Sequence, residues 1–219
     1  MKPRFLLAAI VVLVTFCLTS EPATAGPITF NFTGTITQVP ALDPASPFPD
    51  PIDLGTPFSG TYTFDSTASN DIVGDPSSGS YASPLGTFTL DLGGLALSFT
   101  GLSVVTFDTS FFDFYGVVHS ENPTPDSPTG VTISISLPDA TGMALSSNAL
   151  LLVPPSLAAF DVTNSFFFTD TIDGNQVEVG GALDSLTCGA GCSVPEPPVP
   201  MLLAIGVVVL ALRLRRPCA

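Results

Sequence analysis

The sequence predicts an all-β domain, an antiparallel β-sandwich or a jelly-roll-like barrel, with one apolar helical segment at each end of the chain. Thr, Ser, Phe, Val, Gly and Pro dominate the composition, whereas the helix formers Glu, Lys, Gln and Arg are scarce. Apolar and polar residues alternate with a period of two in several segments, which is typical of strands with one buried face. The 19 glycines and 22 prolines punctuate the chain, as expected where short strands are joined by tight turns.

The N-terminal end has the features of a secretion signal. Two basic residues precede an apolar run of about 14 residues, at positions 5–18, which is shorter than the roughly 20 residues of a membrane-spanning helix. Ala23 and Ala25 then place small side chains at the −3 and −1 positions relative to Gly26. We therefore expect residues 1–25 to be a signal helix that signal peptidase removes, with an uncleaved anchor as the alternative.

Four segments define expected strands in the body, residues 26–193, because each places apolar side chains at alternate positions. The positions between them are mostly Thr and Ser, so each strand should have one buried and one solvated face. The expected buried faces are Ile28, Phe30, Phe32 and Ile36; Phe58, Tyr62 and Phe64; Phe88, Leu90 and Leu92; and Val131, Ile133, Ile135 and Leu137.

The connections follow from the turn-forming residues, which cluster at residues 40–57, 70–79, 93–94 and 122–130. Residues 166–172 and 176–183 are typical of a hairpin around Asp173, Gly174 and Asn175. Residues 143–153 fit either a strand or a short helix. Nothing in the pattern determines the order of the strands in space.

The charges are distributed unevenly along the chain. All five Lys and Arg residues lie near the two termini, and none occurs between Gly26 and Leu212. If only residues 26–197 remained, every acidic residue except Glu21 would stay, leaving 18 acids, no Lys or Arg and a net charge of −18. Such a charge argues against nucleic acid as a partner and favours solubility or divalent cations. The alternative is that the acidic residues are simply solvated turns.

Few residues are suited to acid–base chemistry. His119 is the single histidine, and a catalytic triad would need Asp108 or Asp113 to orient it. The sequence has no nucleophile turn of the G-x-S-x-G type, so we expect His119 to be a strand-end residue before a proline-rich loop. A hydrolase with paired carboxylates stays open, because spacing alone selects no pair. We predict a protein that is not an enzyme and name no catalytic residue.

Calcium is the one cofactor for which candidate ligands exist. Oxygen-bearing side chains gather in two places, Asp65, Asn70, Asp71 and Asp75 in one and Asp170, Asp173 and Asn175 in the other. Asp71, Asp75 and Asp173 are the candidate Ca²⁺ ligands. Neither group matches an EF-hand or a nonapeptide repeat, and turn formation alone explains Asp and Asn at such positions.

Cys188 and Cys192 are the two cysteines of the body. In an oxidising compartment we expect them to form a disulfide, since the glycines between them allow the tight loop to close. A C-x-x-x-C pair without a nearby histidine is a poor zinc site, and a redox role would favour C-x-x-C. We therefore predict a structural role for this pair.

The C-terminal end, residues 194–219, has three parts. Pro195, Glu196 and Pro197 form a short motif, and residues 199–212 form an apolar segment about 21 Å long as a helix. A basic cluster follows, made of Arg213, Arg215 and Arg216. By the positive-inside rule these arginines place the C-terminus in the cytoplasm and the body outside the inner membrane.

This tripartite end resembles the PEP-CTERM sorting signal of Gram-negative bacteria. The resemblance implies recognition of the Pro-Glu-Pro motif by an exosortase, a membrane enzyme that would cut near the motif and transfer or release the body. It also implies an inner-membrane intermediate and a final location at the cell surface or in an extracellular, exopolysaccharide-containing biofilm matrix. A plain C-terminal transmembrane anchor is the alternative.

The body adds a second resemblance. Residues 27–100, with ITFNFTGTITQV, PFSGTYTFD and PLGTFTLDLGG, are similar to a β-rich domain often found before PEP-CTERM signals. We therefore expect an exported, non-enzymatic protein of the cell envelope or matrix, with signal peptidase and exosortase as its partners and exopolysaccharide as a candidate one. The alternative is a secreted carbohydrate- or calcium-binding module.

Overall fold

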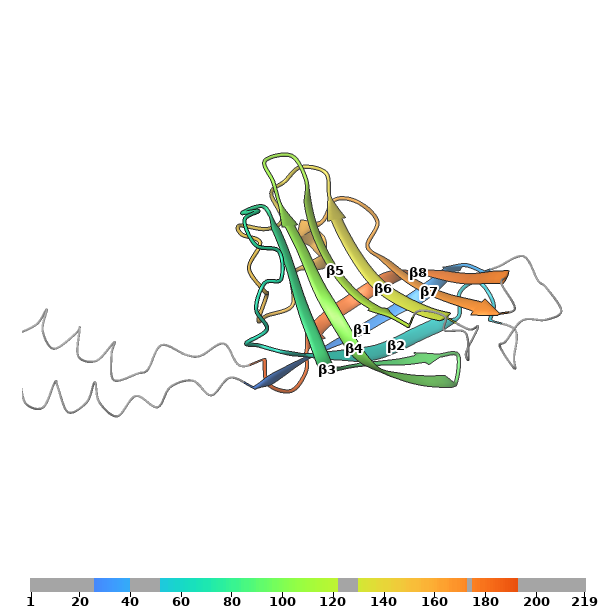
Figure 1. Ribbon diagram of the computed structural model, residues 1–219. Coiled ribbons are helices and arrows are strands. Elements are labelled where there is room, and N and C mark those ends of the chain that lie inside the picture. Colours follow the sequence, from blue (N-terminus) through green and yellow to red (C-terminus); the bar gives the residue numbers. More distant parts are fainter. Residues whose placement is uncertain (1–25, 40–51, 122–129, 173–174, 193–219) are drawn as a thin grey trace, which may run out of the picture. The chain divides into compact units, whose positions relative to one another are not determined.

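A computed structural model describes residues 26–39, 52–121, 130–172 and 175–192, which form a closed barrel of eight antiparallel strands (Figure 1). Each strand pairs with its neighbours in the chain, and the last strand pairs with the first. The strands are β1 (Pro27–Gln38), β2 (Pro57–Asp65), β3 (Ser78–Leu92), β4 (Leu95–Asp108), β5 (Asp113–Ser120), β6 (Gly130–Asp139), β7 (Ser165–Ile172) and β8 (Asn175–Cys188), with a short 3₁₀ turn, η1 (Leu157–Ala159), between β6 and β7.

The all-β, antiparallel prediction is confirmed, but the strands form one sheet in sequential order instead of a sandwich or jelly roll. Those two architectures need strands that leave their sequence neighbour for a different sheet. Here even the long connection from Asp139 to Ser165 joins neighbouring strands, β6 and β7. Periodic alternation identifies the buried face of a strand, and it carries no information about which strand lies beside it. The expected signal and C-terminal helices lie outside the described residues.

Within the described part of the chain, no helix has both the length and the apolar character needed to cross a membrane.

Two tight hairpins have the expected form. β3 and β4 are joined by Gly93 and Gly94, whose φ values of 61° and 97° are both in the left-handed region that a type I′ turn requires. β7 and β8 pair up to Ile172 and Asn175. The predicted hairpin is confirmed, with Asn175 already in the strand.

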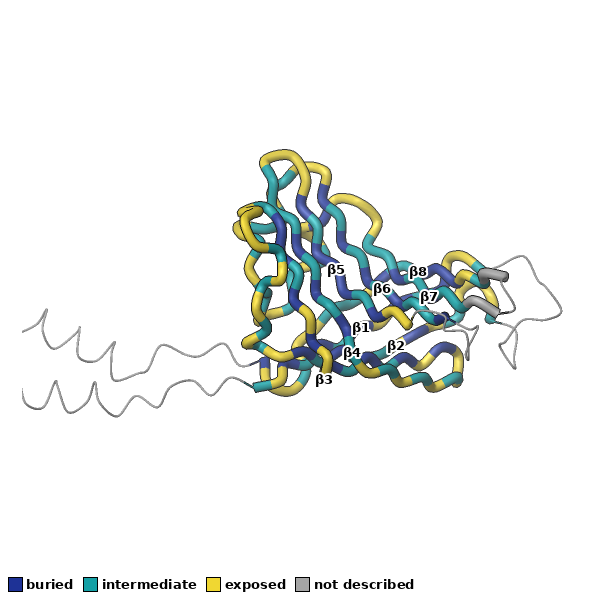
Figure 2. The backbone as a smooth tube through the Cα atoms, viewed as in Figure 1, coloured by how far each residue is buried: buried dark blue, intermediate teal, exposed yellow. Residues whose placement is uncertain are grey.

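The barrel interior is filled by aromatic and aliphatic side chains, and the expected apolar faces of the four segments are buried there. Figure 2 shows buried positions recurring along the strands. Val131 alone among them is only partly buried. Ring centroids of Phe58 and Phe166 are 4.6 Å apart, and those of Phe32 and Phe88 are 5.3 Å apart. The interior is therefore a packed core.

Two inward-facing glycines make room for this core. Gly34 of β1 lies opposite Phe58 of β2, and Gly60 of β2 lies opposite Phe32 of β1. A Cβ atom at either glycine would overlap the facing phenylalanine ring and also a backbone carbonyl oxygen, that of Ala182 or Thr89. Each ring therefore occupies the space that a side chain on the neighbouring strand would need.

Residues 143–153 form neither a strand nor a helix, which corrects both expectations for this segment. They are a succession of bends held by hydrogen bonds to strand residues. The carbonyl oxygen of Asn148 accepts bonds from Tyr81 Oη at 2.8 Å and Thr106 Oγ1 at 2.6 Å, and its side-chain Nδ2 donates to Ser78 O at 2.7 Å. Ala144, Leu145, Leu150 and Leu151 pack individually against the barrel, whereas Met143, Leu152 and Val153 are exposed.

Candidate functional site

His119 is one residue from the end of β5, as predicted, and it is 3% exposed. Its Nδ1 lies 2.5 Å from the carbonyl oxygen of Gly101, so Nδ1 carries the hydrogen that this bond needs. Its Nε2 is 3.5 Å from the carboxylate of Glu121, and its ring packs on Phe99 with centroids 5.0 Å apart. The ring is thus held by the Gly101 carbonyl at one edge and by Phe99 against one face.

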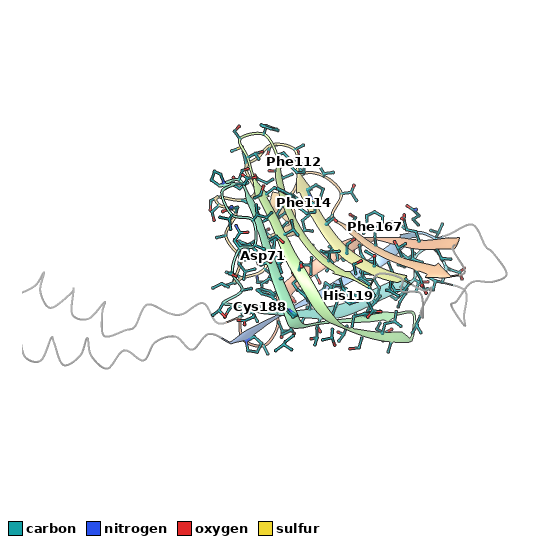
Figure 3. The ribbon with its side chains drawn as sticks, viewed as in Figure 1. Asp71, Phe112, Phe114, His119, Phe167 and Cys188 are labelled. Atoms are coloured by element: carbon teal, nitrogen blue, oxygen red, sulfur yellow. A yellow bond between two sulfur atoms is a disulfide. The ribbon has the colours of Figure 1, made fainter. Side chains whose placement is uncertain are left out.

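The two aspartates considered as partners of His119 lie at the other end of the strand. Asp113 begins β5, six residues before His119, which corresponds to about 20 Å along an extended chain. Asp108 pairs with Asp113 across the β4–β5 ladder and is equally remote. Figure 3 shows the separation, with His119 far from Phe112, the residue before Asp113. The structure does not bring the three residues of a triad together.

The structure does bring together one pair of carboxylates that spacing in the sequence did not select. Asp113 and Asp139 are directly opposite each other in the β5–β6 ladder, and both are 0% exposed. The sequence did contain an indication of this pair. Asp139 continues the alternation of buried residues through Ile135 and Leu137, and Asp113 lies two positions before Tyr115 and so on the same face of its strand. A polar residue on an inward position is the observation that identifies such a pair.

Backbone amides of the β6–β7 connection surround this pair. Asp139 accepts hydrogen bonds from Thr141 N at 3.0 Å, Met143 N at 2.8 Å and Ala144 N at 3.0 Å, and from Thr141 Oγ1 at 2.8 Å. Asp113 accepts from Leu145 N at 2.8 Å and Thr109 N at 3.3 Å. Both carboxylates therefore fix the start of the loop over this end of the barrel.

The charge state of Asp139 follows from two opposing effects. Desolvation acts to raise the pKa of its carboxyl, because burial disfavours the charged form. The hydrogen bonds from Met143, Thr141 and Ala144 stabilise the carboxylate and outweigh desolvation, so the pKa is well below its usual value. Asp139 is therefore ionised in its buried position.

The two tyrosines at the centre of the core form a second buried polar pair. The hydroxyls of Tyr62 and Tyr115 are 3.0 Å apart, and both residues are 0% exposed. Burial raises the pKa of both hydroxyls above the usual range. The pair satisfies polar atoms inside the aromatic core and is closed to solvent.

The carboxylates of Asp75 and Asp65, in and next to the β2–β3 connection, hold local turns. Hydrogen bonds from Ser78 Oγ at 2.6 Å and Ser77 Oγ at 2.7 Å lower the pKa of Asp75. Asp65 is held by Thr67 in the same way, and Asp71 is exposed. Asp173 lies outside the described residues. Across the described ranges, no three His, Cys, Asp or Glu side chains are placed to share an ion.

Cys188 and Cys192 form the expected disulfide, with Cα atoms 5.6 Å apart. The loop between them pairs with the start of β1, since Gly189 N donates to Thr29 O at 2.8 Å and Thr29 N donates to Ala190 O at 2.9 Å. Cys192 itself is 8% exposed and belongs to the core. The disulfide loop therefore fastens the end of β8 to the beginning of β1.

We expect replacement of both cysteines by serine to lower the free energy of unfolding by about 2 kcal/mol, because a closed loop of this length restricts the unfolded chain by that amount. Urea denaturation followed by circular dichroism measures the change. A reducing agent should bring the wild-type protein to the stability of the variant and leave the variant unaffected. Equal stability of both proteins without reductant would contradict the structural role of the bond.

Hydroxyl groups dominate the outer face of strands β8, β1, β2 and β3, where they lie in rows across the sheet. Some neighbours within the rows form hydrogen bonds between their side-chain oxygens. These are Thr29 and Thr63 at 2.8 Å, Thr61 and Thr89 at 2.8 Å, and Thr33 and Ser185 at 2.7 Å. The rows are Thr29, Thr63 and Thr87; Thr187, Asn31, Thr61 and Thr89; and Ser185, Thr33, Ser59 and Asp91.

The third row opens into a hollow of about 500 Å³ beside the β3–β4 turn. It is lined by the ring of Pro57, by the glycines of the turn and by hydroxyl and carboxylate groups. The polar side chains in it are Thr33, Thr35, Ser59, Asp91 and Asp184. A smaller hollow of about 340 Å³ lies near Pro27 and Leu85 and has Asp65 as its one charged group. The larger of these two hollows is lined by residues of four strands, β8, β1, β2 and β3.

The remaining predicted functional residues lie outside the described part of the chain. These are the signal-cleavage residues Ala23 and Ala25, the Pro195–Glu196–Pro197 motif and the basic residues Arg213, Arg215 and Arg216. Gly26, on the other side of the expected cleavage, is described, and its amide donates to Ser66 Oγ at 3.2 Å.

A scan against protein-family models finds no match to this chain. Searches of curated proteins and of solved structures find no similar protein.

Proposed function

We propose that this chain is an exported, non-enzymatic protein of the bacterial cell envelope or extracellular matrix, delivered by a cleavable signal peptide and sorted by an exosortase. The observation that carries the proposal is the confinement of every Lys and Arg to the two ends, where each basic cluster borders an apolar segment. That arrangement is what a pair of membrane-directed signals flanking an extracytoplasmic domain requires.

The barrel supports a structural role for the body. Its buried acidic, histidine and tyrosine side chains all hold parts of the barrel together, as the contacts of Asp139, His119 and Tyr62 show. The disulfide between Cys188 and Cys192 suits an oxidising compartment. Its outward Thr and Ser rows give a hydrophilic surface without positive charge.

The test is the fate of the full chain in a Gram-negative host with and without its exosortase. We expect the product from the exosortase-containing host to begin at Gly26, to lack its C-terminal arginines and to leave the inner membrane. Deleting the exosortase should leave a chain with its C-terminal end intact in the inner-membrane fraction. Glu196→Ala in the intact host should have the same effect. Mass spectrometry of the two ends and cell fractionation give the readout.

Glu121→Ala is the matched control, because it removes an exposed carboxylate of the barrel and leaves the motif unchanged. It should be cut and released like the wild-type chain. A chain with the same C-terminal end and the same location in both hosts would refute sorting by an exosortase and favour a plain anchor.

A further inference from the structure

The hollow beside the β3–β4 turn has a chemical character that differs from the rest of the surface. Two exposed aspartates, Asp91 and Asp184, stand at its two sides, and the hydroxyls of Thr33, Thr35 and Ser59 lie between them. Four strands contribute to it, from β8 through β1 and β2 to β3. The site is therefore built by sheet register and not by one flexible loop.

Each carboxylate is oriented by a hydrogen bond from the barrel. Asp184 Oδ2 accepts from Thr35 Oγ1 at 3.0 Å, and Asp91 Oδ1 accepts from the amide of Gly94 at 2.9 Å. An ionised carboxylate offers about four acceptor positions, so each group retains capacity for further hydrogen bonds. Gly93 and Gly94 have no side chains to cover Asp91, so the hollow stays open at the turn.

The spacing of the carboxylates argues against a shared cation. Asp184 and Asp91 lie on β8 and β3, three strand spacings apart, which corresponds to about 14 Å between their backbones. Calcium needs several oxygens within about 2.6 Å of one point. The row of hydroxyls between the carboxylates instead offers a succession of donors and acceptors along an extended ligand.

The charge of the site selects among extended polar ligands. The described barrel has no Lys or Arg, so nothing in the hollow would pair with uronate, phosphate or sulfate groups. Carboxylates accept hydrogen bonds from neutral hydroxyl groups, and these charge-assisted bonds are the stronger kind. Vicinal sugar hydroxyls match two-oxygen acceptors, and the exposed ring of Pro57 gives an apolar contact for a sugar's C–H face.

We propose that this hollow binds a neutral polysaccharide, with Asp91 and Asp184 accepting hydrogen bonds from sugar hydroxyls at two separated positions. The proposal rests on the export proposed above, because such a ligand lies outside the cytoplasm. It assigns a ligand class to one surface of a barrel that is otherwise a scaffold.

Affinity electrophoresis and calorimetry test the proposal with purified full-length protein in detergent. The probes are dextran, mannan and galactan as neutral polymers, and polygalacturonate as the acidic counterpart. We expect saturable binding to at least one neutral polymer, no binding to polygalacturonate and no change on adding EDTA. Asp91→Asn and Asp184→Asn should each weaken binding at least about tenfold, because each exchanges a charged acceptor for a neutral amide.

Asp71→Asn is the matched control. Asp71 is exposed, and its backbone amide donates a hydrogen bond to the carbonyl oxygen of Ser80 on β3. Ser80 precedes Asp91 by eleven residues on the same strand, so Asp71 lies about 36 Å along the strand from Asp91. It should bind like the wild-type protein, and the melting curves of all three variants should agree. Ser59→Trp, which fills the hollow, should abolish binding.

Three results would overturn the proposal: no binding to any neutral polymer, equal affinity in wild type, Asp91→Asn and Asp184→Asn, or binding that requires calcium. Fractionation of the Asp91→Asn and Asp184→Asn chains in the exosortase-containing host separates this failure from failure of the proposed function. Normal processing and release would leave the proposed function standing whatever the hollow binds.

Discussion

Replacing Gly34 by alanine is expected to lower the free energy of unfolding by about 3 kcal/mol, at the upper end of what overpacking a core costs. The added Cβ would overlap both the Phe58 ring and the carbonyl oxygen of Ala182 on β8. The ring can rotate away, but the carbonyl belongs to the ladder that closes the barrel. Urea denaturation, followed by circular dichroism because the chain has no tryptophan, measures the loss.

Gly180→Ala on β8 is the control for this substitution. The nearest atom to its Cβ would be Gln38 Cβ at 3.2 Å, and Gln38 is the last residue of β1, where a shift of a few tenths of an ångström disturbs little of the ladder, so we expect a change below about 1 kcal/mol. Adding Phe58→Leu to Gly34→Ala should recover only part of the loss, since the carbonyl of Ala182 stays in place. Equal stability of Gly34→Ala and Gly180→Ala would show that the β1–β8 junction is looser than the structure has it.

Asp139→Asn should lower the melting temperature by about 10 °C, the scale expected when several buried hydrogen bonds are lost together. The amide would present an N–H group to amides that now donate to the carboxylate, at Thr141 or at Met143 and Ala144. The start of the β6–β7 connection would then be released from the barrel. Amide hydrogen exchange at residues 141–145 should rise in the variant.

The same substitution should change how stability depends on pH. The native pKa of Asp139 is lowered, so its contribution is fully present above the unfolded pKa of about 4 and is lost as pH falls toward the native pKa. The wild-type protein should therefore lose stability below about pH 4 more steeply than Asp139→Asn. Gly180→Ala, which changes no titratable group, should retain the wild-type slope. Parallel curves for wild type and Asp139→Asn would contradict an ionised, buried Asp139.

The sequence predicts local features well because they depend on neighbouring residues. Alternation in β1 places Phe30 and Phe32 inside, and paired glycines at positions 93–94 produce the left-handed turn. The disulfide was predictable for the same reason, since only three residues separate its two cysteines. Even His119 was correctly placed near a strand end, although its burial was not foreseen.

The features that sequence reasoning missed depend on pairs distant in the chain. The Asp113–Asp139 pair exists because β5 and β6 meet in one particular register, and the hollow exists because Asp184 and Asp91 reach one surface through four strands. Closure of the barrel likewise depends on β1 meeting β8. Residues 143–153 were misjudged because some of their apolar side chains, such as Leu145 and Leu150, pack individually while others, such as Met143, are exposed.

Closure of the barrel also sets the order of events during synthesis. The partner of β1 on one side is β8, and a contact such as Thr33 with Ser185 joins residues 152 positions apart. β1 can therefore pair with β2 early, but its pairing with β8 cannot form until nearly the whole body has been made. Loop-closure entropy makes such distant pairings slow, so the barrel should fold in milliseconds to seconds instead of microseconds. Any chaperone that meets the nascent chain will meet it with the β1 ladder still incomplete.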